Sequence, residues 1–245
     1  MKQHEAVIST MERLGGVATL GQLNQEVFKI TGCEWKTKTP FASIRRIVQT
    51  NNEIYKIKPG LYGLQSYKKQ NETKGIIEET ARNKDSKEIS EFNHSYYQGL
   101  VLIIGNLKNY ETYLPGQDKN KLFLDERLGD LSTLSKIPAY SYENLVKRSS
   151  TIDAIWFSER MMPHSFFEIE HSTDIQNSLL KFNDLQDFHS RMFIVADKMR
   201  KVEFEQKRNY AALKDIKARV QFLDYETLAK QYEQTIEGKK FSVLI

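Results

Sequence analysis

The first 65 residues show the hydrophobic period of helices and then that of strands. Apolar residues recur at helical spacing in three segments, which predicts helices over residues 6–14, 20–30 and 39–49. Thr39 suits the N-cap of the third helix, and Pro40 suits its first helical position. Around the turn signal Pro59-Gly60, residues 54–64 predict a hairpin. The pattern therefore predicts a small domain over residues 1–65.

Residues 66–92 are rich in Lys, Glu, Asn and Ser, which predicts a charged linker that is partly helical over residues 76–82. Between residues 93 and 245, segments of strand length alternate with segments of helical period, apart from an irregular polar stretch over residues 116–135. Strands are expected over residues 111–114, 152–157, 166–172, 192–196 and 219–223. Helices are expected over residues 94–108, 142–148, 175–188, 202–213 and 225–234. This alternation predicts an α/β domain with a mixed or parallel sheet covered on both faces.

Two of the expected strands carry acidic residues within an otherwise apolar sequence. Asp153 lies near the start of one strand, and Glu168 and Glu170 lie one residue apart on the next. Because side chains alternate along a strand, the two glutamates face the same way, opposite to Ile169 and His171. If the strands pair as a hairpin, Asp153 lies beside Glu168. Three carboxylates repel one another unless a hard cation holds them, which predicts a site for Mg²⁺ or Mn²⁺.

Composition excludes several other classes of protein. The chain has 245 residues, 40% hydrophobic and 28% charged, as in a globular protein with a sizeable core. A single cysteine, Cys33, excludes an intramolecular disulfide and a cysteine-based zinc site. No signal-peptide pattern follows Met1, and the longest apolar run, residues 100–104, is too short to span a bilayer. We therefore expect a cytoplasmic protein without a membrane partner.

Basic residues gather on and around the third helix. Residues 1–64 contain nine Lys and Arg and five Asp and Glu, a net charge of +4 that equals that of the whole chain. Three helices followed by a hairpin is the order of a winged helix-turn-helix, a common DNA-binding module. The DNA-binding residues expected on the third helix and beside it are Lys36, Lys38, Ser43, Arg45, Arg46, Gln49, Lys56 and Lys58.

The acidic strands resemble the PD-(D/E)XK, or restriction-endonuclease-like, nuclease superfamily over residues 97–234. In that superfamily an Asp opens one strand and an acid-x-Lys motif occupies the next. Here the motif is Asp153 followed by Glu168-Ile169-Glu170, so that Glu replaces the usual Lys. The resemblance implies metal-assisted phosphodiester hydrolysis, with Mg²⁺ bound by Asp153, Glu168 and the Ile169 carbonyl. It assigns Glu170 to metal binding or to orientation of the attacking water.

The small domain resembles winged helices of the HARE-HTH kind over residues 2–65. The shared features are the residues 15–20 turn, the Thr39-Pro40 helix start with Ser43-Ile44-Arg45-Arg46, and the Pro59-Gly60-Leu61-Tyr62 wing. The resemblance implies a recognition helix in the major groove and phosphate contacts from Lys56 and Lys58. The alternative is a winged helix that docks onto a protein. The adjacent arginines Arg45 and Arg46 favour DNA binding over protein docking.

Several further polar residues each have two interpretations. His171 suits a general base, but alternation directs it away from the glutamates and favours packing or hydrogen bonding. Lys181 lies on the following helix, and its side chain either contacts a phosphate group or faces solvent. Gln98 is a candidate for a further polar group in the site. The basic residues within 197–201 directly follow a buried strand, a position at which α/β folds tend to place ligand contacts. They are therefore candidates for DNA contacts, and the alternative is a charged surface loop.

The leading hypothesis is an Mg²⁺-dependent endonuclease that cuts double-stranded DNA in restriction or phage defence. It combines a winged helix at 1–65, a linker at 66–92 and a mixed-sheet nuclease domain at 93–245. The alternative is a non-catalytic DNA-binding regulator with a nuclease-like scaffold. The absence of the motif Lys supports this alternative, whereas the presence of all three acidic residues argues against it. A third hypothesis is action on RNA or damaged DNA. Symmetric cutting of both strands requires a homodimer or two binding events.

Overall fold

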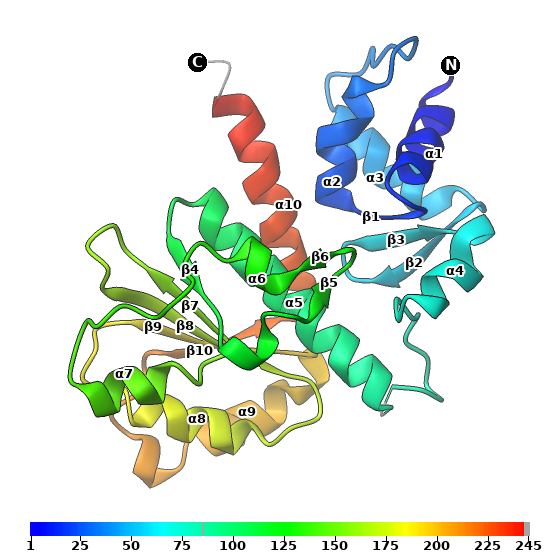
Figure 1. The fold of residues 1–245 in the computed structure, drawn as a ribbon. Helices are drawn as coiled ribbons and strands as arrows, with labels where there is room; N and C mark the ends of the chain where they lie inside the picture. Colours follow the sequence, from blue (N-terminus) through cyan, green and yellow to red (C-terminus); the bar gives the residue numbers. More distant parts are fainter. Residues whose placement is uncertain (85, 243–245) are drawn as a thin grey trace. The chain divides into compact units, whose positions relative to one another are not determined.

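A computed structural model describes residues 1–84 and 86–242 of the chain, which form two compact units (Figure 1). The first unit contains Met1–Phe92 together with the C-terminal segment from Ala229, and the second contains Asn93–Leu228. Within the described residues, no helix has both the length and the apolar character needed to cross a membrane.

The first unit contains three helices and a three-stranded antiparallel sheet. The helices are α1 (Gln3–Arg13), α2 (Leu20–Glu26), continued by the short η1 (Val27–Lys29), and α3 (Pro40–Thr50). The strands β1 (Val17–Thr19), β2 (Ile54–Lys58) and β3 (Leu61–Leu64) pair in the order β1-β3-β2. The three predicted helices and the predicted hairpin are therefore present. The Thr19 side chain caps α2 by accepting a hydrogen bond from the Gln22 backbone, as expected of a threonine at this position.

The C-terminal helix α10 (Tyr225–Ser242) belongs to the first unit from Ala229 onward. Tyr232 and Ile236 lie so close to Gly21 of α2 that a Cβ atom there would overlap both side chains. The Tyr232 hydroxyl also lies 3.3 Å from Thr19 Oγ1. The sequence analysis placed this helix in the second domain. The structure groups its later turns with the N-terminal helices instead, because Tyr232 and Ile236 are buried there.

The segment predicted as a linker has local structure of its own. It contains η2 (Gln65–Tyr67) and α4 (Lys68–Thr73), whereas residues 76–82 are not helical, so the helix predicted there is wrong. Gly75 has a positive φ of 79° just after α4, a conformation that favours glycine and ends helices. Beyond it, Glu79 pairs with Lys58 at 2.7 Å.

The second unit is built on a five-stranded mixed sheet in the order β10-β9-β8-β7-β4. The strands are β4 (Glu111–Tyr113), β7 (Ala154–Phe157), β8 (Pro163–Glu170), β9 (Arg191–Ala196) and β10 (Val220–Asp224). β8, β9 and β10 are parallel, whereas β7 is antiparallel to both β8 and β4. The predicted α/β domain with a mixed sheet is therefore confirmed.

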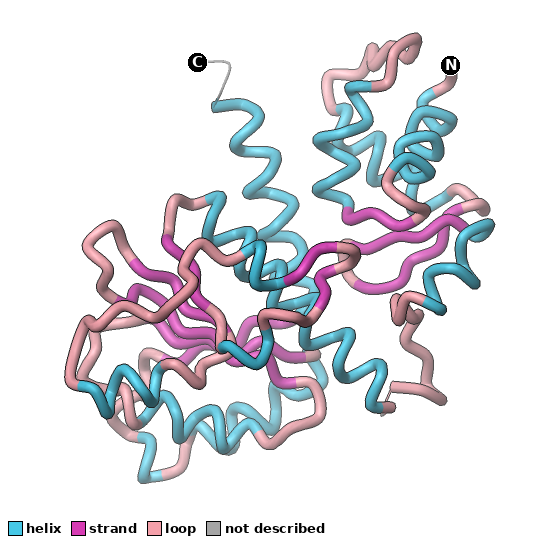
Figure 2. The backbone as a smooth tube through the Cα atoms, viewed as in Figure 1, coloured by secondary structure: helices cyan, strands magenta, loops and turns pink. Residues whose placement is uncertain are grey.

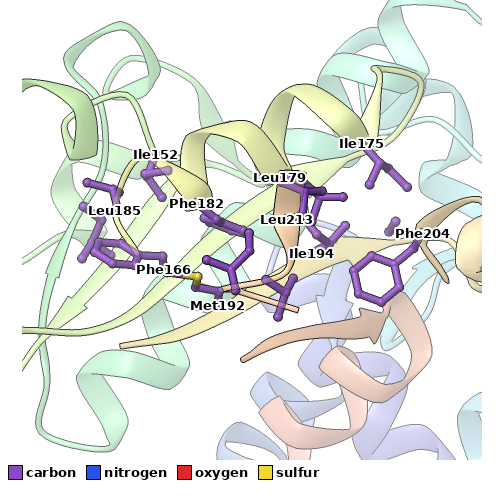
Figure 3. Close-up of a cluster of buried hydrophobic side chains, with 14 of the residues drawn as sticks. Ile152, Phe166, Ile175, Leu179, Phe182, Leu185, Met192, Ile194, Phe204 and Leu213 are labelled. Atoms are coloured by element: carbon purple, nitrogen blue, oxygen red, sulfur yellow. The ribbon is translucent and has the colours of Figure 1, made fainter. Parts of the chain in front are cut away.

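Helices cover both faces of this sheet (Figure 1). On one face lies α5 (Lys87–Leu107), whose Val101 carbonyl accepts a hydrogen bond from Trp156 Nε1 at 3.1 Å. On the other lie α8 (Ile175–Asn183) and α9 (Lys201–Arg208). Figure 3 shows Leu179 and Phe182 of α8 packed against Phe166 and Met192 of the sheet. α5 begins seven residues before the predicted start at 94, because Ile89 and Phe92 are buried and extend its apolar face.

The segment between β4 and the helix α7 (Glu143–Ser149) is mostly loop, as predicted (Figure 2). Its regular pieces are short: η3 (Gly116–Asp118), the hairpin β5 (Leu122–Phe123) and β6 (Glu126–Arg127), and α6 (Leu128–Leu131). Asp118 of η3 is nevertheless buried. The loop therefore contributes a carboxylate to the interior of the unit.

Candidate functional site

The β7–β8 hairpin brings the two predicted acidic strands together. Its register pairs Ala154 with Phe167, so one further step places Asp153 opposite Glu168. The Ile169 backbone N–H donates to Asp153 Oδ2 at 2.7 Å. The antiparallel pairing predicted from the sequence is present, and it holds the Asp153 carboxylate at the end of β8.

Glu168 is a carboxylate in the protein interior, with 1% of its surface exposed. Its pKa is raised from 4.5 to about 8, mainly by burial and then by the nearby Asp153 carboxylate, while Lys181 opposes the shift. Lys181 Nζ of α8 lies 2.7 Å from Glu168 Oε2, and the Ser178 hydroxyl donates to the same oxygen at 2.7 Å. The helix that covers this face of the sheet therefore supplies a cation to the buried acid.

Glu170 lies on the same face as Glu168, as alternation predicts. The Ser178 hydroxyl lies within hydrogen-bond distance of both glutamates, and the Thr173 hydroxyl donates to Glu170. Both glutamates are buried, and Glu170 is held by hydroxyl groups, whereas Glu168 is held by an ammonium group as well. The two carboxylates therefore have different electrostatic surroundings.

Asp153 has a second set of neighbours that the sequence analysis did not identify. The pKa of its carboxyl is raised from 3.8 to about 7, mainly by burial, and the hydrogen bond from Ile169 opposes this shift. Asp153 Oδ1 lies 3.8 Å from His94 Nε2 of α5, and Asp118 Oδ2 lies 3.9 Å from the same nitrogen. Burial, and then the charge of Lys121, lower the pKa of His94. Lys121 pairs with Asp118 Oδ1 at 2.6 Å.

The only sequence signal for these neighbours was Gln98, one helical turn after His94. The sequence indicates Gln98 as a candidate for a further polar group of the site. Its side-chain Nε2 donates to the Asp153 carbonyl at 2.6 Å and to Asp118 Oδ2 at 3.1 Å. Residues four apart share one face of a helix, so His94 and Gln98 point into the same corner. No sequence pattern indicated Asp118 as a residue of the site, because it lies in an irregular loop.

The side chains around Asp153 fit a divalent cation. Half-buried Asp153 and buried Glu168 have pKa values raised to about 7 and about 8, so the protein alone does not fully compensate their ionised forms. His94 Nε2 is buried without a hydrogen-bond partner among the described residues. A bound cation would stabilise both carboxylates, and buried charges commonly depend on such coordination.

The remaining residues considered around the cluster are tied into the second unit. The His171 ring lies 2.9 Å from the Asn93 amide nitrogen, on the α5 side and away from the glutamates, as alternation predicts. Arg200 donates to the backbone carbonyls of His171 and Thr173. Lys198 and Lys201, from the same basic segment, are exposed.

The predicted DNA-binding residues of the first unit separate into two groups. Lys36, Lys38, Arg46, Gln49 and Lys56 are exposed, and Ser43 is half-buried at the start of α3. Arg45 instead pairs with Glu233 at 3.1 Å and Glu237 at 3.6 Å, both on α10. The Lys58 side chain is 2% exposed and pairs with Glu79, and burial lowers its pKa. Arg45 and Lys58 are therefore occupied by partners within the chain.

Comparison with known proteins links the second unit to restriction enzymes. The model of the family described as "Type II restriction enzyme NmeDI C-terminal domain" matches residues 76–243. The type II restriction enzyme NmeDI of Neisseria meningitidis serogroup C is 24% identical over 156 residues, which covers 60% of this chain and 44% of that relative. The aligned region is thus less than half of the relative's length. No solved structure is significantly similar to the chain.

Proposed function

The chain belongs to the family of the type II restriction enzyme NmeDI C-terminal domain, and we propose that it is a Mg²⁺-dependent DNA endonuclease of the restriction or phage-defence type. The matched residues 76–243 include every residue of the carboxylate cluster. The observation that carries the proposal is the juxtaposition of half-buried Asp153 and buried Glu168, which the β7–β8 pairing brings together with Lys181 beside Glu168. Structural ion pairs are common, but two adjacent carboxyls with raised pKa values are characteristic of functional sites.

In this proposal Asp153, Glu168 and the Ile169 carbonyl hold the metal ion. Bound Mg²⁺ would lower the pKa of a water ligand and stabilise the charge that develops on the phosphate. Oxygen-only ligands suit Mg²⁺, and Mn²⁺ accepts the same set. The arrangement resembles PD-(D/E)XK nucleases, in which an Asp and an acid on the next strand perform this role.

Lys181 takes the place of the lysine that the motif lacks. Position 170 is Glu, whereas the ammonium group beside Glu168 comes from α8, 3.0 Å from Oε1 and 2.7 Å from Oε2. The neighbouring carboxylates raise its pKa although burial opposes this, so the group remains charged at neutral pH. A fixed positive charge next to the metal ligands can hold a phosphate oxygen or orient a water molecule. Glu170, held by Ser178 and Thr173, orients water or neighbouring ligands.

A DNA cleavage assay tests the proposed function. Plasmid and phage genomic DNA, methylated and unmethylated, would be incubated with the wild-type protein and Glu168→Ala, with Mg²⁺ or Mn²⁺. We expect discrete fragments from the wild-type protein alone. Cutting by both proteins would place the active site elsewhere. Intact DNA under every condition, together with normal DNA binding, would favour the non-catalytic DNA-binding regulator.

For the first unit we propose a DNA-binding winged helix in which Arg46 and Gln49 read the duplex. Arg46→Ala should weaken binding to a duplex of about 30 base pairs by roughly tenfold. It should also reduce the slope of log binding constant against log salt concentration by about one. Arg45→Ala should weaken binding less, because Arg45 is already paired with Glu233 and Glu237.

Fluorescence anisotropy across a salt series measures both effects. The adjacent arginines serve as matched controls for each other, since the substitution and the helix are the same. Arg45→Ala should also lower thermal stability, because Glu233 is 8% exposed and would lose a cation. Equal losses of DNA affinity in the two variants would contradict the proposed division of roles.

A further inference from the structure

His94, Asp118 and Asp153 come from three different parts of the second unit and converge on one point. His94 lies on α5, Asp118 ends η3, and Asp153 precedes β7. One ligand atom from each residue lies within 4.8 Å of the corresponding atoms of the other two. We propose that these three residues form a second cation site, which takes a first-row transition-metal ion such as Mn²⁺ or Co²⁺ in preference to Mg²⁺.

Each carboxylate directs one oxygen at the histidine and has a protein partner on its other oxygen. Asp153 Oδ2 accepts from the Ile169 N–H, and Asp153 Oδ1 lies 3.8 Å from His94 Nε2. Asp118 Oδ1 pairs with Lys121 at 2.6 Å, and Asp118 Oδ2 lies 3.9 Å from His94 Nε2. Gln98 donates to Asp118 Oδ2 and to the Asp153 carbonyl, which fixes both residues. Such partners orient ligands in metal sites.

Two buried polar atoms of this corner lack partners among the described residues. One is His94 Nε2, and the other is Oε1 of Gln98, a residue with no exposed surface. A buried polar atom without a partner is energetically costly, and a bound ion is one way to satisfy it. A cation between the three residues would bind His94 Nε2 directly. The His94 side chain is 22% exposed, which leaves a route from solvent.

The donor set determines the class of metal. Imidazole nitrogen together with carboxylate oxygens suits transition-metal ions, whereas Mg²⁺ prefers oxygen ligands alone. Metal–ligand bonds of about 2.0–2.2 Å place neighbouring donor atoms roughly 3–3.5 Å apart. The observed 3.8 and 3.9 Å require closure by less than about 1 Å around the ion. This site shares Asp153 with the proposed nuclease site, but the inference concerns metal binding and does not depend on DNA cleavage.

Binding of Mn²⁺ to the full chain tests the inference. Metal-free protein would be titrated with MnCl₂ by calorimetry, and pulsed electron paramagnetic resonance would detect histidine nitrogen coupled to the bound Mn²⁺. We expect nitrogen coupling in the wild-type protein and its loss in His94→Gln, with an affinity at this site at least about tenfold lower. His189→Gln is the matched control, since His189 is an exposed histidine of the same unit.

Glu168→Gln separates this inference from the proposed function. It should abolish cleavage and retain the nitrogen-coupled Mn²⁺. If the wild-type protein shows no nitrogen coupling, or His94→Gln leaves it unchanged, the inference is overturned. If His94→Gln does not fold, as judged by near-ultraviolet circular dichroism, Asp118→Asn carries the same expected loss of affinity. Nitrogen-coupled Mn²⁺ in a protein that does not cut DNA would support the inference and reject the nuclease proposal.

Discussion

Asp153→Asn is expected to abolish DNA cleavage and at the same time to stabilise the metal-free protein. The substitution removes a proposed metal ligand, and metal ions contribute several kcal/mol to such reactions, roughly a thousandfold in rate. In the absence of metal, however, the ionised carboxylate is a cost, because its pKa is raised to about 7 by burial. Asparagine retains an oxygen that can accept the Ile169 hydrogen bond.

The gain in stability should depend on pH. The native state retains the Asp153 proton up to about pH 7, whereas the unfolded chain releases it near pH 3.8, so the contribution of Asp153 to stability falls between these values. At pH 8 we expect the variant to be more stable by about 1–2 kcal/mol, or a few degrees in Tm. Near pH 4 the difference should largely disappear.

Thermal unfolding in EDTA at pH 4, 6 and 8, combined with single-turnover cleavage, measures both effects. Asp187→Asn is the control, because Asp187 is an exposed aspartate of the same unit and should change neither quantity. Cleavage at the wild-type rate by Asp153→Asn would exclude Asp153 as a metal ligand. A loss of stability at pH 8 would mean that its ionised form is well compensated by the protein alone.

Lys181→Met should destabilise the metal-free protein, and more at pH 9 than at pH 6. Lys181 is the cation that pairs with buried Glu168, and removal of one partner of a buried pair commonly costs about 3–5 kcal/mol. We expect a loss of about 2–3 kcal/mol at pH 9, because Lys181 is 25% exposed and solvent screens part of the interaction. Methionine keeps most of the apolar length of the side chain.

The pH dependence follows from the raised pKa of Glu168. Its native value of about 8 exceeds the ordinary 4.5, so its contribution to stability falls as pH rises from about 4.5 to 8. At pH 6 Glu168 is protonated in both proteins, and the substitution costs little. Above pH 8 the wild-type carboxylate is ionised and paired, whereas the variant must keep a proton or bury an uncompensated charge.

Urea denaturation at pH 6 and pH 9 measures the difference. The double variant Glu168→Gln with Lys181→Met should recover most of the loss at pH 9, since it removes both charges together. If Lys181→Met loses equal stability at both pH values, packing of the side chain and not its charge accounts for the effect. If the double variant recovers nothing, Glu168 is not the group that depends on Lys181.

The acidic hairpin shows how far local sequence can predict a site. Alternation along β8 was sufficient to place Glu168 and Glu170 on one face, and the short turn between two apolar segments predicted the antiparallel pairing. These inferences succeeded because a strand has a period of two and a hairpin joins neighbours in the chain. The positions of Lys181 and Ser178 required the packing of α8 on the sheet, which no local pattern specifies.

His94 and Asp118 show where sequence reasoning stopped. His94 lies 59 positions before Asp153, and Asp118 lies in a loop without hydrophobic period. Their approach depends on how α5 and a polar loop fold around the end of β7. The same limit affected the first unit, in which Arg45 and Lys58 were expected to contact DNA. Their acidic partners lie outside the predicted small domain, since Glu233 belongs to the predicted nuclease domain and Glu79 to the predicted linker.

Local sequence patterns were sufficient to predict the order and type of most elements, the mixed α/β class of the second unit and the strands that carry the three carboxylates. Hydrophobic periodicity, helix caps and turns depend on a few neighbouring residues, so they can be recognised in the amino-acid sequence itself. Three features became visible only in the folded chain: the partners of those carboxylates, the assignment of the last helix turns to the first unit, and the convergence of His94 and Asp118 on Asp153. These features depend on burial between distant segments, because desolvation and charge pairing act through space and not along the chain.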